Sequence, residues 1–371
     1  MSKHIKVLVV AGARPNFMKV APIIAALKAG GHESVLVHTG QHYDAEMSGA
    51  FFRDLGIPDP DYHLSVGSGT HAQQTARIME AFEPVLIATK PDWLLVVGDV
   101  NSTIATALVA SKLRQQLGCR IVHVEAGLRS NDWRMPEEVN RVLTDRLSDL
   151  LLTPSADALP NLLAEGIPPD RIEFVGNVMI DTLMMHLDEA RARKIPERFG
   201  LKSGEYVLAT LHRPSNVDSA EVVAPILEAL ARVSKTMPVV LPIHPRTRRS
   251  VATFGLDALL GELRVVDPLG YVDMLGLTDG SAVVLTDSGG LQEETTALGV
   301  PCVTLREQTE RPITVEQGTN KLAPWPLTAD GIFNSFDEAR RRGRAAVGAR
   351  SPDGWDGRTA FRIVESLVRR S

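Results

Sequence analysis

Short apolar runs alternate with amphipathic segments along most of the chain. Runs such as IKVLVVAG at 5–12 and DWLLVVGD at 92–99 are continuous, which is typical of strands buried on both faces of a parallel sheet. The intervening segments, such as STIATALVASKLRQQ at 102–116, carry apolar residues at helical spacing. Alternation of this kind predicts an α/β fold with doubly wound parallel sheets.

The alternation occurs in two successive stretches. In the first, we expect strands at 5–12, 34–40, 92–99, 120–127, 149–155 and 171–176, and helices at 15–30, 70–89, 102–116, 136–148, 156–165 and 181–194. A Pro-, Gly- and charge-rich segment, IPERFGLKSGEY at 195–206, is the candidate linker. In the second stretch, we expect strands at 206–212, 238–244, 263–268, 281–288 and 300–305, and helices at 219–236, 271–278, 290–298 and 357–370. The pattern predicts two Rossmann-like domains facing a central cleft.

Composition excludes several classes of function. The 371 residues are too many for one typical domain, and 40 basic against 45 acidic residues give a net charge of −5, which argues against a nucleic-acid partner. The basic run RRRGR at 340–344 is interpreted as a solvated helix face. No CxxC pair or other metal-ligand spacing occurs, and no apolar run approaches the ~18 residues of a membrane span. We therefore expect a cytoplasmic protein without a metal, a membrane partner or a nucleic-acid partner.

Candidate acid–base groups follow the predicted strands. Asp99 and Glu125 come at strand ends, Glu137 begins a helix, and His212 with Arg213 follows a strand of the second stretch. Because ligands of open parallel sheets bind at the carboxyl ends of strands, these side chains are expected to face a ligand. Taken singly, each carboxylate could instead be a helix cap or part of a strand-end ion pair.

Two turns have the character of anion sites. GARP at 12–15 leads into a helix that carries Arg14 and Lys19, and TDSGGLQEE at 286–294 presents Ser288, Gly289 and Gly290 at a helix start. Either turn could also be an ordinary tight connection between a strand and a helix. Acid–base groups combined with a phosphate cradle favour chemistry on a nucleotide-sugar.

A family resemblance rests on motifs in a fixed order. They are GARPNFMKVAP, TGQHYD, VVGDVNST, HVEAGLRS, PEEVNR, ATLHRPSNVD, PIHPRT, TDSGGLQEE, LGVPCVTLREQTERPITVEQGTN and WDGRTAFRI. Together they resemble the non-hydrolysing UDP-N-acetylglucosamine 2-epimerase family from residue 5 to about residue 364. The resemblance implies a glycosyltransferase-B type fold, with the helix at 356–371 joining a first domain of residues 1–194. Residues 195–355 would form the second, UDP-binding domain.

The resemblance also implies an activity and its residues. Members interconvert UDP-N-acetylglucosamine and UDP-N-acetylmannosamine at C2 by eliminating UDP to 2-acetamidoglucal and adding it back, without a cofactor. Asp99, Glu125, Glu137 and His212 match the catalytic residues of the family. The matching substrate- and UDP-binding residues are Arg14, Lys19, Ser288, Gly289, Gly290, Glu294 and Arg311. Residues of a possible second site or supporting shell are Gln41, His42, Arg213 and His244, whereas His123 is expected to be a packed partner.

Other functions stay open at this point. The chain could epimerise a further-modified UDP-N-acetylhexosamine such as a UDP-diacetamido-uronic acid, or it could be a hydrolysing 2-epimerase that releases free N-acetylmannosamine. A retaining glycosyltransferase on the same fold and a non-catalytic UDP-sugar sensor are the remaining alternatives. Retention of Asp99, Glu125, Glu137 and His212 argues against a sensor. A UDP-sugar is the expected ligand and a homodimer the expected assembly.

Overall fold

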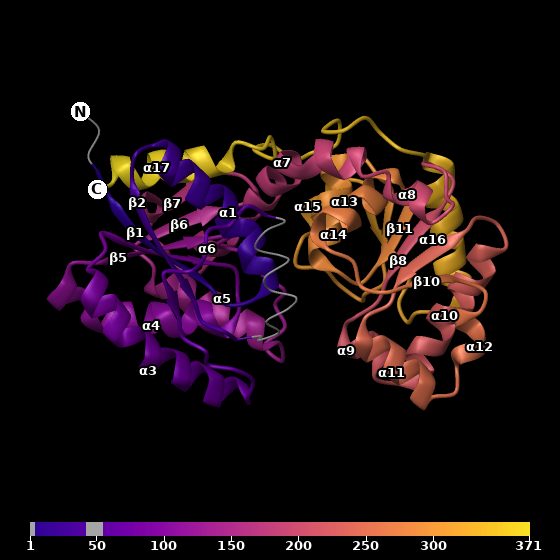
Figure 1. Ribbon diagram of the computed structural model, residues 1–371, viewed down its shortest axis with the longest axis horizontal. Coiled ribbons are helices and arrows are strands. Elements are labelled where there is room, and N and C mark those ends of the chain that lie inside the picture. Colours follow the sequence, from indigo (N-terminus) through magenta and orange to yellow (C-terminus); the bar gives the residue numbers. More distant parts are fainter. Residues whose placement is uncertain (1–3, 42–54) are drawn as a thin grey trace. The chain divides into compact units, whose positions relative to one another are not determined.

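Parallel strands form two separate sheets in the computed structural model, which describes residues 4–41 and 55–371 apart from the side chains of Arg14 and Pro15. The chain divides into two units, each with its own sheet (Figure 1). The first unit comprises residues 1–182 and 353–371, and the second comprises residues 183–352. The division falls inside one helix, α7 (Val178–Ala192).

The sheet of the first unit has seven strands in the order β3-β2-β1-β4-β5-β6-β7. The strands are β1 (Lys6–Ala11), β2 (Glu33–His38), β3 (Tyr62–His63), β4 (Trp93–Val97), β5 (Arg120–Val124), β6 (Leu150–Thr153) and β7 (Ile172–Phe174). Every neighbouring pair is parallel. The order reverses between β1 and β4, so these adjacent strands mark the topological switch point at which such sheets bind ligands.

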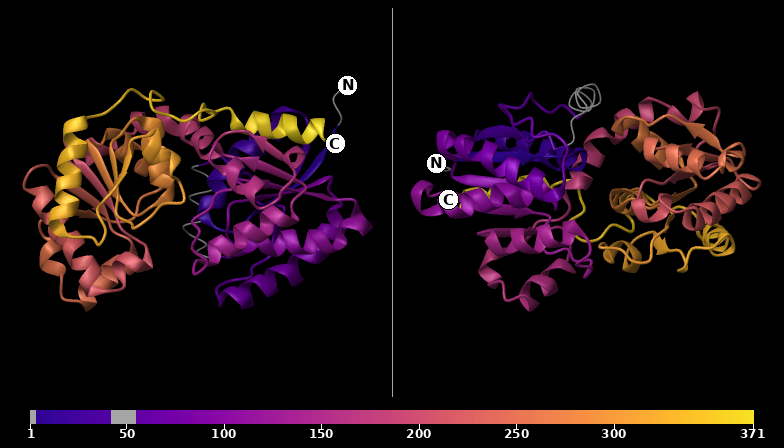
Figure 2. Two further views of the ribbon diagram at one scale, coloured as in Figure 1. Left: turned by 180° about the vertical axis from the view of Figure 1, so that it is seen from behind. Right: turned by 90° about the horizontal axis from the view of Figure 1, so that it is seen from below.

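Helices cover both faces of this sheet. They are α1 (Arg14–Ala29), α3 (His71–Thr89), α4 (Asn101–Leu117), α5 (Pro136–Leu147), α6 (Ala158–Ala164), the 3₁₀ turn η1 (Pro169–Arg171), the first part of α7, and α17 (Thr359–Arg369). Apolar residues of α3 and α4 pack on β1, β2, β4 and β5, while α1 and α17 lie together on the other face (Figures 1 and 2). The start of α3 follows from its sequence, because Thr70 and Gln73 form a capping box.

The last helix belongs to the first unit although it is distant in sequence. Its buried face consists of Ala360, Ile363, Val364 and Leu367, and it packs against α1. Asp181 of α7 accepts hydrogen bonds from the backbone N–H groups of Thr359 (3.1 Å) and Ala360 (2.7 Å). A side chain 178 residues away in the sequence therefore caps the start of α17.

The sheet of the second unit has six strands in the order β10-β9-β8-β11-β12-β13, again all parallel. The strands are β8 (Val207–Thr210), β9 (Val239–Pro242), β10 (Arg264–Val266), β11 (Val283–Thr286), β12 (Cys302–Thr304) and β13 (Asn320–Leu322). Its order reverses between β8 and β11, which repeats the winding of the first sheet. The two sheets thus share one plan.

The second unit also has helices on both faces of its sheet (Figure 1). They are α8 (Ile195–Arg198), α9 (Pro214–Val217), α10 (Ala220–Ser234), α11 (Pro245–Thr253), α12 (Asp257–Leu260), α13 (Tyr271–Gly280), α14 (Gly289–Leu298), α15 (Ile313–Glu316) and α16 (Ala329–Arg342). Apolar residues of α10 and α16 share one core with β8, β9, β11 and β12, and α14 packs on the opposite face beside α13. Arg340–Arg342 end α16 with exposed side chains, which confirms the solvated basic helix face.

The main differences from the sequence-based prediction concern short or polar elements. Strand β3 has two residues, Tyr-His, and β13 is the polar segment Asn-Lys-Leu, so neither gives an apolar run. Helices α11 and α16 were missed because their exposed faces are rich in charge. The segment expected to be a linker at 195–206 begins with α8 and ends in the core, where Tyr206 is fully buried and its hydroxyl donates to the carbonyl of Leu277.

Candidate active site

The predicted catalytic carboxylates of the first unit lie around the carboxyl ends of its central strands. Asp99 follows β4, Glu125 follows β5 and Glu137 lies in the first turn of α5. The turn after β1, at the adjacent strand of the switch point, leads into α1 and Lys19. This arrangement brings acid–base groups to the sheet edge where doubly wound sheets bind ligands.

Glu125 forms a buried ion pair with Lys19. The Lys19 ammonium contacts Oε2 of Glu125, and only 8% and 6% of the two side chains are exposed. Glu125 has a φ of +69°, a left-handed conformation that is unfavourable for a residue with a Cβ and that occurs preferentially at functional sites. A Cβ at Gly98 would lie 3.1 Å from Lys19 Nζ, so the glycine leaves space for the ammonium. Lys19, which was expected to contact the nucleotide or its diphosphate, instead neutralises the negative charge of the Glu125 carboxylate in this structure.

Asp99 is held by an arginine that the sequence analysis did not identify. Arg141 of α5 donates to Asp99 Oδ2 (2.6 Å) and to Glu138 Oε2 (3.0 Å), and its own side chain is buried. Asn140 donates to the backbone carbonyl of Asp99 (2.9 Å). Helix α5 thus positions Asp99, whose side chain stays 31% exposed. The signal in the sequence was the PEEVNR motif, in which Arg141 lies one helical turn after Glu137.

The two adjacent glutamates of α5 have different environments. Glu138 is buried and accepts from the backbone N–H groups of Ser130 and Asn131, which ties down the preceding loop. Glu137 is half-buried, and within residues 4–41 and 55–371 no hydrogen bond or ion pair engages its carboxylate. Glu138 is therefore a structural residue, whereas the Glu137 carboxylate can bind a ligand without breaking a contact.

His123 is a packed residue beneath this site, as expected. Its Nε2 lies 2.8 Å from the carbonyl oxygen of Gly98 and its Nδ1 2.6 Å from Asp145 Oδ1. Burial would raise the pKa of Asp145, but His123 and Arg129 outweigh it and hold that pKa below its usual value. This fully buried pair supports the loop that carries Asp99 from below.

Residues of the possible second site are only partly described. Gln41 is buried, and its Oε1 accepts from the backbone N–H (3.2 Å) and hydroxyl (2.8 Å) of Ser102. Its backbone carbonyl accepts from Gln74 (3.0 Å). Gln41 therefore braces the start of α4 in this structure. His42 and the side chain of Arg14 lie outside the described residues.

In the second unit, His212 is paired with a buried aspartate that the sequence analysis did not identify. His212 Nδ1 lies 2.8 Å from Asp287 Oδ1 at the switch point between β8 and β11. Asp287 also accepts from the backbone N–H groups of His212 (3.0 Å) and Arg213 (2.9 Å). Burial alone would raise the pKa of Asp287, but these donors lower it below its ordinary value. In the sequence Asp287 directly precedes the SGG motif.

The glycine-rich turn begins helix α14. Ser288 is the N-cap residue, and its N–H donates to Thr286 Oγ1 (2.9 Å), while Gly289 and Gly290 are the first helical residues. Amides at the start of a helix have no intrahelical acceptor and favour anions. A Cβ on Gly289 would lie 2.9 Å from an Arg311 guanidinium nitrogen, so this glycine lets the arginine approach the backbone of the turn.

Arg311 belongs to a buried charge cluster beside the turn. Glu310 lies 2.7 Å from Arg306, 2.8 Å from Arg311 and 3.3 Å from Arg213. Burial would raise the pKa of Glu310, but the three guanidinium groups hold it far below its usual range. Arg311 also pairs with Glu293 (2.9 Å). The cluster combines three cations with two anions and leaves one positive charge, which suits an anionic ligand.

Glu294 is buried rather than exposed on its helix. Burial is the largest cause that raises its pKa to about 8, and neighbouring Glu293 acts in the same direction, while the nearby Tyr271 hydroxyl opposes it. A carboxyl group with this pKa is largely protonated at neutral pH, so it can both donate to and accept from a hydroxyl group.

His244 caps helix α11. Its Nδ1 accepts from the backbone N–H of Arg246 (3.2 Å), and its ring centroid lies 6.5 Å from that of His212. The helix-capping contact gives His244 a local structural role next to the predicted catalytic histidine. Sequence reasoning had assigned it only to a supporting or second-site role.

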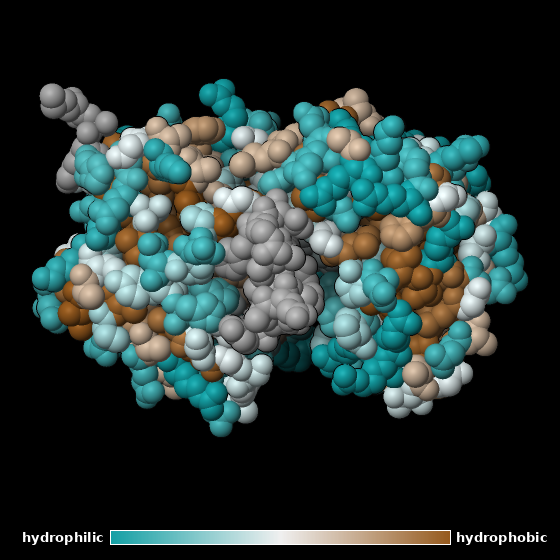
Figure 3. All heavy atoms as spheres, in the orientation of Figure 1, coloured by the Kyte–Doolittle hydropathy of each residue, from teal (hydrophilic) through white to brown (hydrophobic). Residues whose placement is uncertain are grey.

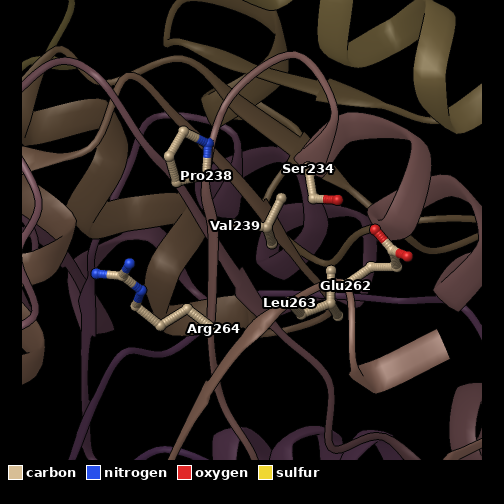
Figure 4. A pocket seen from close by; sticks show the side chains of 6 residues that line it. All are labelled: Ser234, Pro238, Val239, Glu262, Leu263 and Arg264. Carbon is tan, nitrogen blue, oxygen red and sulfur yellow. The ribbon is translucent and has the colours of Figure 1, made fainter. Parts of the chain in front are cut away.

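Other features of the surface lie away from these residues. A cavity of about 310 Å³ is lined by residues at the amino ends of β9 and β10, the sheet edge opposite His212 (Figure 4). Apolar side chains gather on the same unit over β10 and α10 (Figure 3). In the described part of the chain, no group of three or more His, Cys, Asp or Glu side chains could hold a metal ion. No described helix is long and apolar enough to cross a membrane.

The fold and these side chains define a class, an α/β enzyme with two Rossmann-like units of the glycosyltransferase-B type. The chain belongs to the UDP-N-acetylglucosamine 2-epimerase family, whose model matches residues 25–368. The predicted family and fold class are therefore confirmed.

Three similar proteins illustrate the relationship. The UDP-N-acetylglucosamine 2-epimerase of Methanococcus maripaludis is 42% identical over 326 residues, which cover 86% of this chain and 87% of that protein. The UDP-2,3-diacetamido-2,3-dideoxy-D-glucuronate 2-epimerase of Pseudomonas aeruginosa is 45% identical over 322 residues, covering 85% and 88%. A crystal structure of Methanocaldococcus jannaschii UDP-GlcNAc 2-epimerase in complex with UDP-GlcNAc and UDP superposes with a TM-score of 0.87 at 38% identity. It covers 98% of this chain and 99% of that one. The family supports an epimerase that acts at C2 of a UDP-sugar.

Proposed function

We propose that this protein catalyses the reversible conversion of UDP-N-acetylglucosamine to UDP-N-acetylmannosamine by eliminating and re-adding UDP. A base removes the C2 proton, the C1–O bond breaks and UDP leaves, which gives 2-acetamidoglucal. Re-addition of UDP to C1, with a proton delivered to the other face of C2, gives the epimer. The protons and the UDP removed in the first half are returned in the second, so no oxidant or cofactor is needed.

The observation that supports this proposal most is the set of carboxylates at the switch point of the first sheet. Asp99 and Glu125 each have a cationic partner, Arg141 and Lys19, and Glu137 is half-buried beside them on α5. Removal and delivery of protons on opposite faces of one carbon require more than one acid–base group. We assign Asp99, Glu125 and Glu137 to proton transfer at C2 or near the departing phosphate.

Residues of the second unit are proposed to bind UDP and to assist its departure. The amides of Gly289 and Gly290 with Arg311 would bind the diphosphate, and Glu294 would bind ribose hydroxyl groups. His212 would donate a proton or a hydrogen bond to the leaving phosphate. Arg14 is assigned to the nucleotide by its motif.

Two outcomes separate the reaction from its alternatives. We expect purified protein incubated with UDP-N-acetylglucosamine in deuterated water to give both epimers with deuterium at C2. Proton NMR of the reaction mixture measures this incorporation. Epimerisation without solvent deuterium would contradict proton abstraction at C2. Accumulation of free N-acetylmannosamine would identify a hydrolysing enzyme instead. The Glu137→Gln variant, expected to be roughly 10²–10⁴-fold slower, serves as the control.

The 45% identity to a diacetamido-glucuronate epimerase supports a second candidate substrate. Parallel assays with UDP-N-acetylglucosamine and UDP-2,3-diacetamido-2,3-dideoxy-glucuronate would compare kcat/KM for the two sugars. A preference of tenfold or more for the uronate, corresponding to about 1.4 kcal/mol, would reassign the substrate while leaving C2 epimerisation in place.

A further inference from the structure

Asp287 is a buried carboxylate to which the reaction above gives no role. It is fully buried one residue after β11, and it receives hydrogen bonds from the loop after β8 and from α9. Its oxygens accept from the His212 N–H (3.0 Å), the Arg213 N–H (2.9 Å) and the Asn216 side chain (3.3 Å). All three donors reach Oδ2, and the His212 N–H also lies 3.2 Å from Oδ1, so both oxygens of Asp287 act as acceptors.

The remaining contact of Asp287, with the His212 ring, determines which ring nitrogen carries the proton. His212 Nδ1 lies 2.8 Å from Asp287 Oδ1, and an ionised carboxylate can only accept. Nδ1 must therefore carry the proton. In a neutral imidazole the lone pair then resides on Nε2, and the His212 side chain is 46% exposed.

We propose that Asp287 is a positioning residue that holds His212 as the Nδ1-protonated tautomer and reserves Nε2 for proton exchange with the substrate. The role of Asp287 in catalysis rests on the proposed function, whereas the tautomer of His212 rests only on the contacts described above. Asp287 also immediately precedes Ser288 and the first turn of α14, so one carboxylate fixes the histidine next to the proposed diphosphate cradle.

The charges around the pair are consistent with an ionised Asp287. Arg213 Nε donates to the Asp287 backbone carbonyl (3.2 Å), and the guanidinium groups of Arg306 and Arg311 flank Glu310 in the same cluster. His244, the N-cap residue of α11, is an ionisable side chain beside the His212 ring. The net positive surroundings favour a carboxylate over a protonated acid at Asp287.

The isosteric variant Asp287→Asn makes a sharp test. Backbone N–H groups of His212 and Arg213 both point at Oδ2, so the amide oxygen of the asparagine should occupy that position. Its NH₂ group would then face His212 Nδ1 and require that nitrogen to accept. The tautomer should invert to Nε2-protonated, which places the proton on the nitrogen meant to exchange it.

The measurement is the two-bond ¹H–¹⁵N correlation spectrum of the histidine rings, recorded at a pH where His212 is neutral and assigned with His212→Gln. Wild-type protein should show a protonated Nδ1 and an unprotonated Nε2, and Asp287→Asn should exchange the two. A protonated Nε2 in the neutral wild-type ring would overturn the inference. This wild-type result needs no substrate and does not depend on whether Asp287→Asn folds.

Kinetics supply the catalytic readout. Asp287→Asn should lower kcat by roughly 10²–10⁴-fold, the usual worth of a positioned acid or base, with UDP affinity within a few-fold of wild type. Asn216→Ser is the matched control, because it removes another donor to Asp287 but leaves the His212 contact; it should keep the wild-type tautomer. An inverted tautomer with unchanged kcat would overturn the positioning role while leaving epimerisation intact. Absence of epimerisation in wild type would count against the proposed function, with the tautomer still judged by the spectrum.

Discussion

The Lys19–Glu125 pair links stability to chemistry at the level of single residues. Two opposite charges that are both about nine-tenths buried stabilise one another only as a pair, because either ion alone is costly inside a protein. The left-handed backbone of Glu125 adds a local cost that the surrounding loop must sustain. The surrounding structure thus holds a proposed catalytic residue in a backbone conformation that glutamate does not favour.

Removal of the cation should therefore destabilise the fold. Lys19→Met should lower the free energy of unfolding by roughly 3–5 kcal/mol, the usual loss on breaking a buried ion pair. The double variant Lys19→Met/Glu125→Gln should recover much of this loss, since the carboxylate is then neutral. Urea unfolding of the singles and the double gives the coupling, with exposed Lys28→Met on the same helix as the control. Additive losses in the double variant would show that the two side chains do not depend on each other.

The three proposed catalytic carboxylates should be separable from their structural neighbour. Asp99→Asn, Glu125→Gln and Glu137→Gln should each reduce turnover by roughly 10²–10⁴-fold, with little change in UDP affinity. Glu138→Gln should instead lower the unfolding free energy, because Glu138 anchors the backbone of Ser130. Steady-state kinetics and UDP calorimetry on the four variants make the comparison. A carboxamide variant with near-normal turnover would remove that residue from the catalytic set.

Glu294 should make stability depend on pH. Its folded-state pKa of about 8 exceeds the ordinary 4.5, so the folded protein holds this proton more tightly than the unfolded chain does. The contribution of Glu294 to stability is then greatest below pH 4.5 and decreases as pH rises towards 8, by up to about 5 kcal/mol. Unfolding free energies measured across this window should fall less in Glu294→Gln, with exposed Glu307→Gln as control. Parallel curves for wild type and Glu294→Gln would contradict the raised pKa.

Among the elements, α17 depends on a residue outside its own sequence. The carboxylate of Asp181 provides the acceptors for the first amides of the helix, and the burial of that carboxylate raises its pKa. Asp181→Ala should lower the unfolding free energy by roughly 1–2 kcal/mol, as for loss of an N-cap. Asp181→Asn keeps a hydrogen-bond acceptor and should lower the unfolding free energy much less at pH 7. At that pH the substitution also removes the unfavourable burial of a charge. Urea unfolding and amide exchange in α17 provide the measurements; an equal loss in both variants would exclude capping as the cause.

Sequence patterns predicted the elements whose burial is uniform. Strand β4 is buried at all five positions, and its continuous apolar run made it easy to recognise. Strand β3 has only two residues and β13 (Asn-Lys-Leu) is polar. Helix α11 begins with Pro245 and a set of arginines, a composition typical of a loop. Amphipathic α16 was also missed because its exposed face is rich in charge, and the polar strand β13 before it was not recognised.

Motifs predicted the side chains that face the candidate site but not those that hold them. Asp99 and His212 were identified by motif, whereas Arg141 and Asp287, which bind them, lie 42 and 75 residues away in the sequence. Lys19 was assigned to the nucleotide because a lysine near a glycine-rich turn favours phosphate, and only the fold reveals its contact with Glu125. Contacts between the ends of different strands depend on the order of strands in a sheet, which no local pattern encodes.

At the scale of the whole molecule, all the proposed UDP contacts except Arg14 lie in one of the two units. Gly289, Gly290, Glu294 and Arg311 all lie within residues 183–352. UDP at 100 times its dissociation constant adds about 2.7 kcal/mol to the folded state that binds it. Amide exchange with UDP should therefore slow most in β11 and α14, and Arg311→Ala should abolish the effect at the same UDP concentration. Protection confined to β4 and β5 instead would place the nucleotide elsewhere.

The return of α17 to the first unit has a consequence for biosynthesis. The ribosome makes residues 1–182 first, yet the helix that covers the buried face of α1 comes only after the 170 residues from Leu183 to Pro352. At synthesis rates of 5–20 residues per second, the apolar surface of α1 stays uncovered for roughly 10–30 s before α17 is made. The second unit, continuous in sequence, can be complete before the first. Of the two units, the one whose synthesis starts earlier is therefore exposed for longer to chaperones and to aggregation.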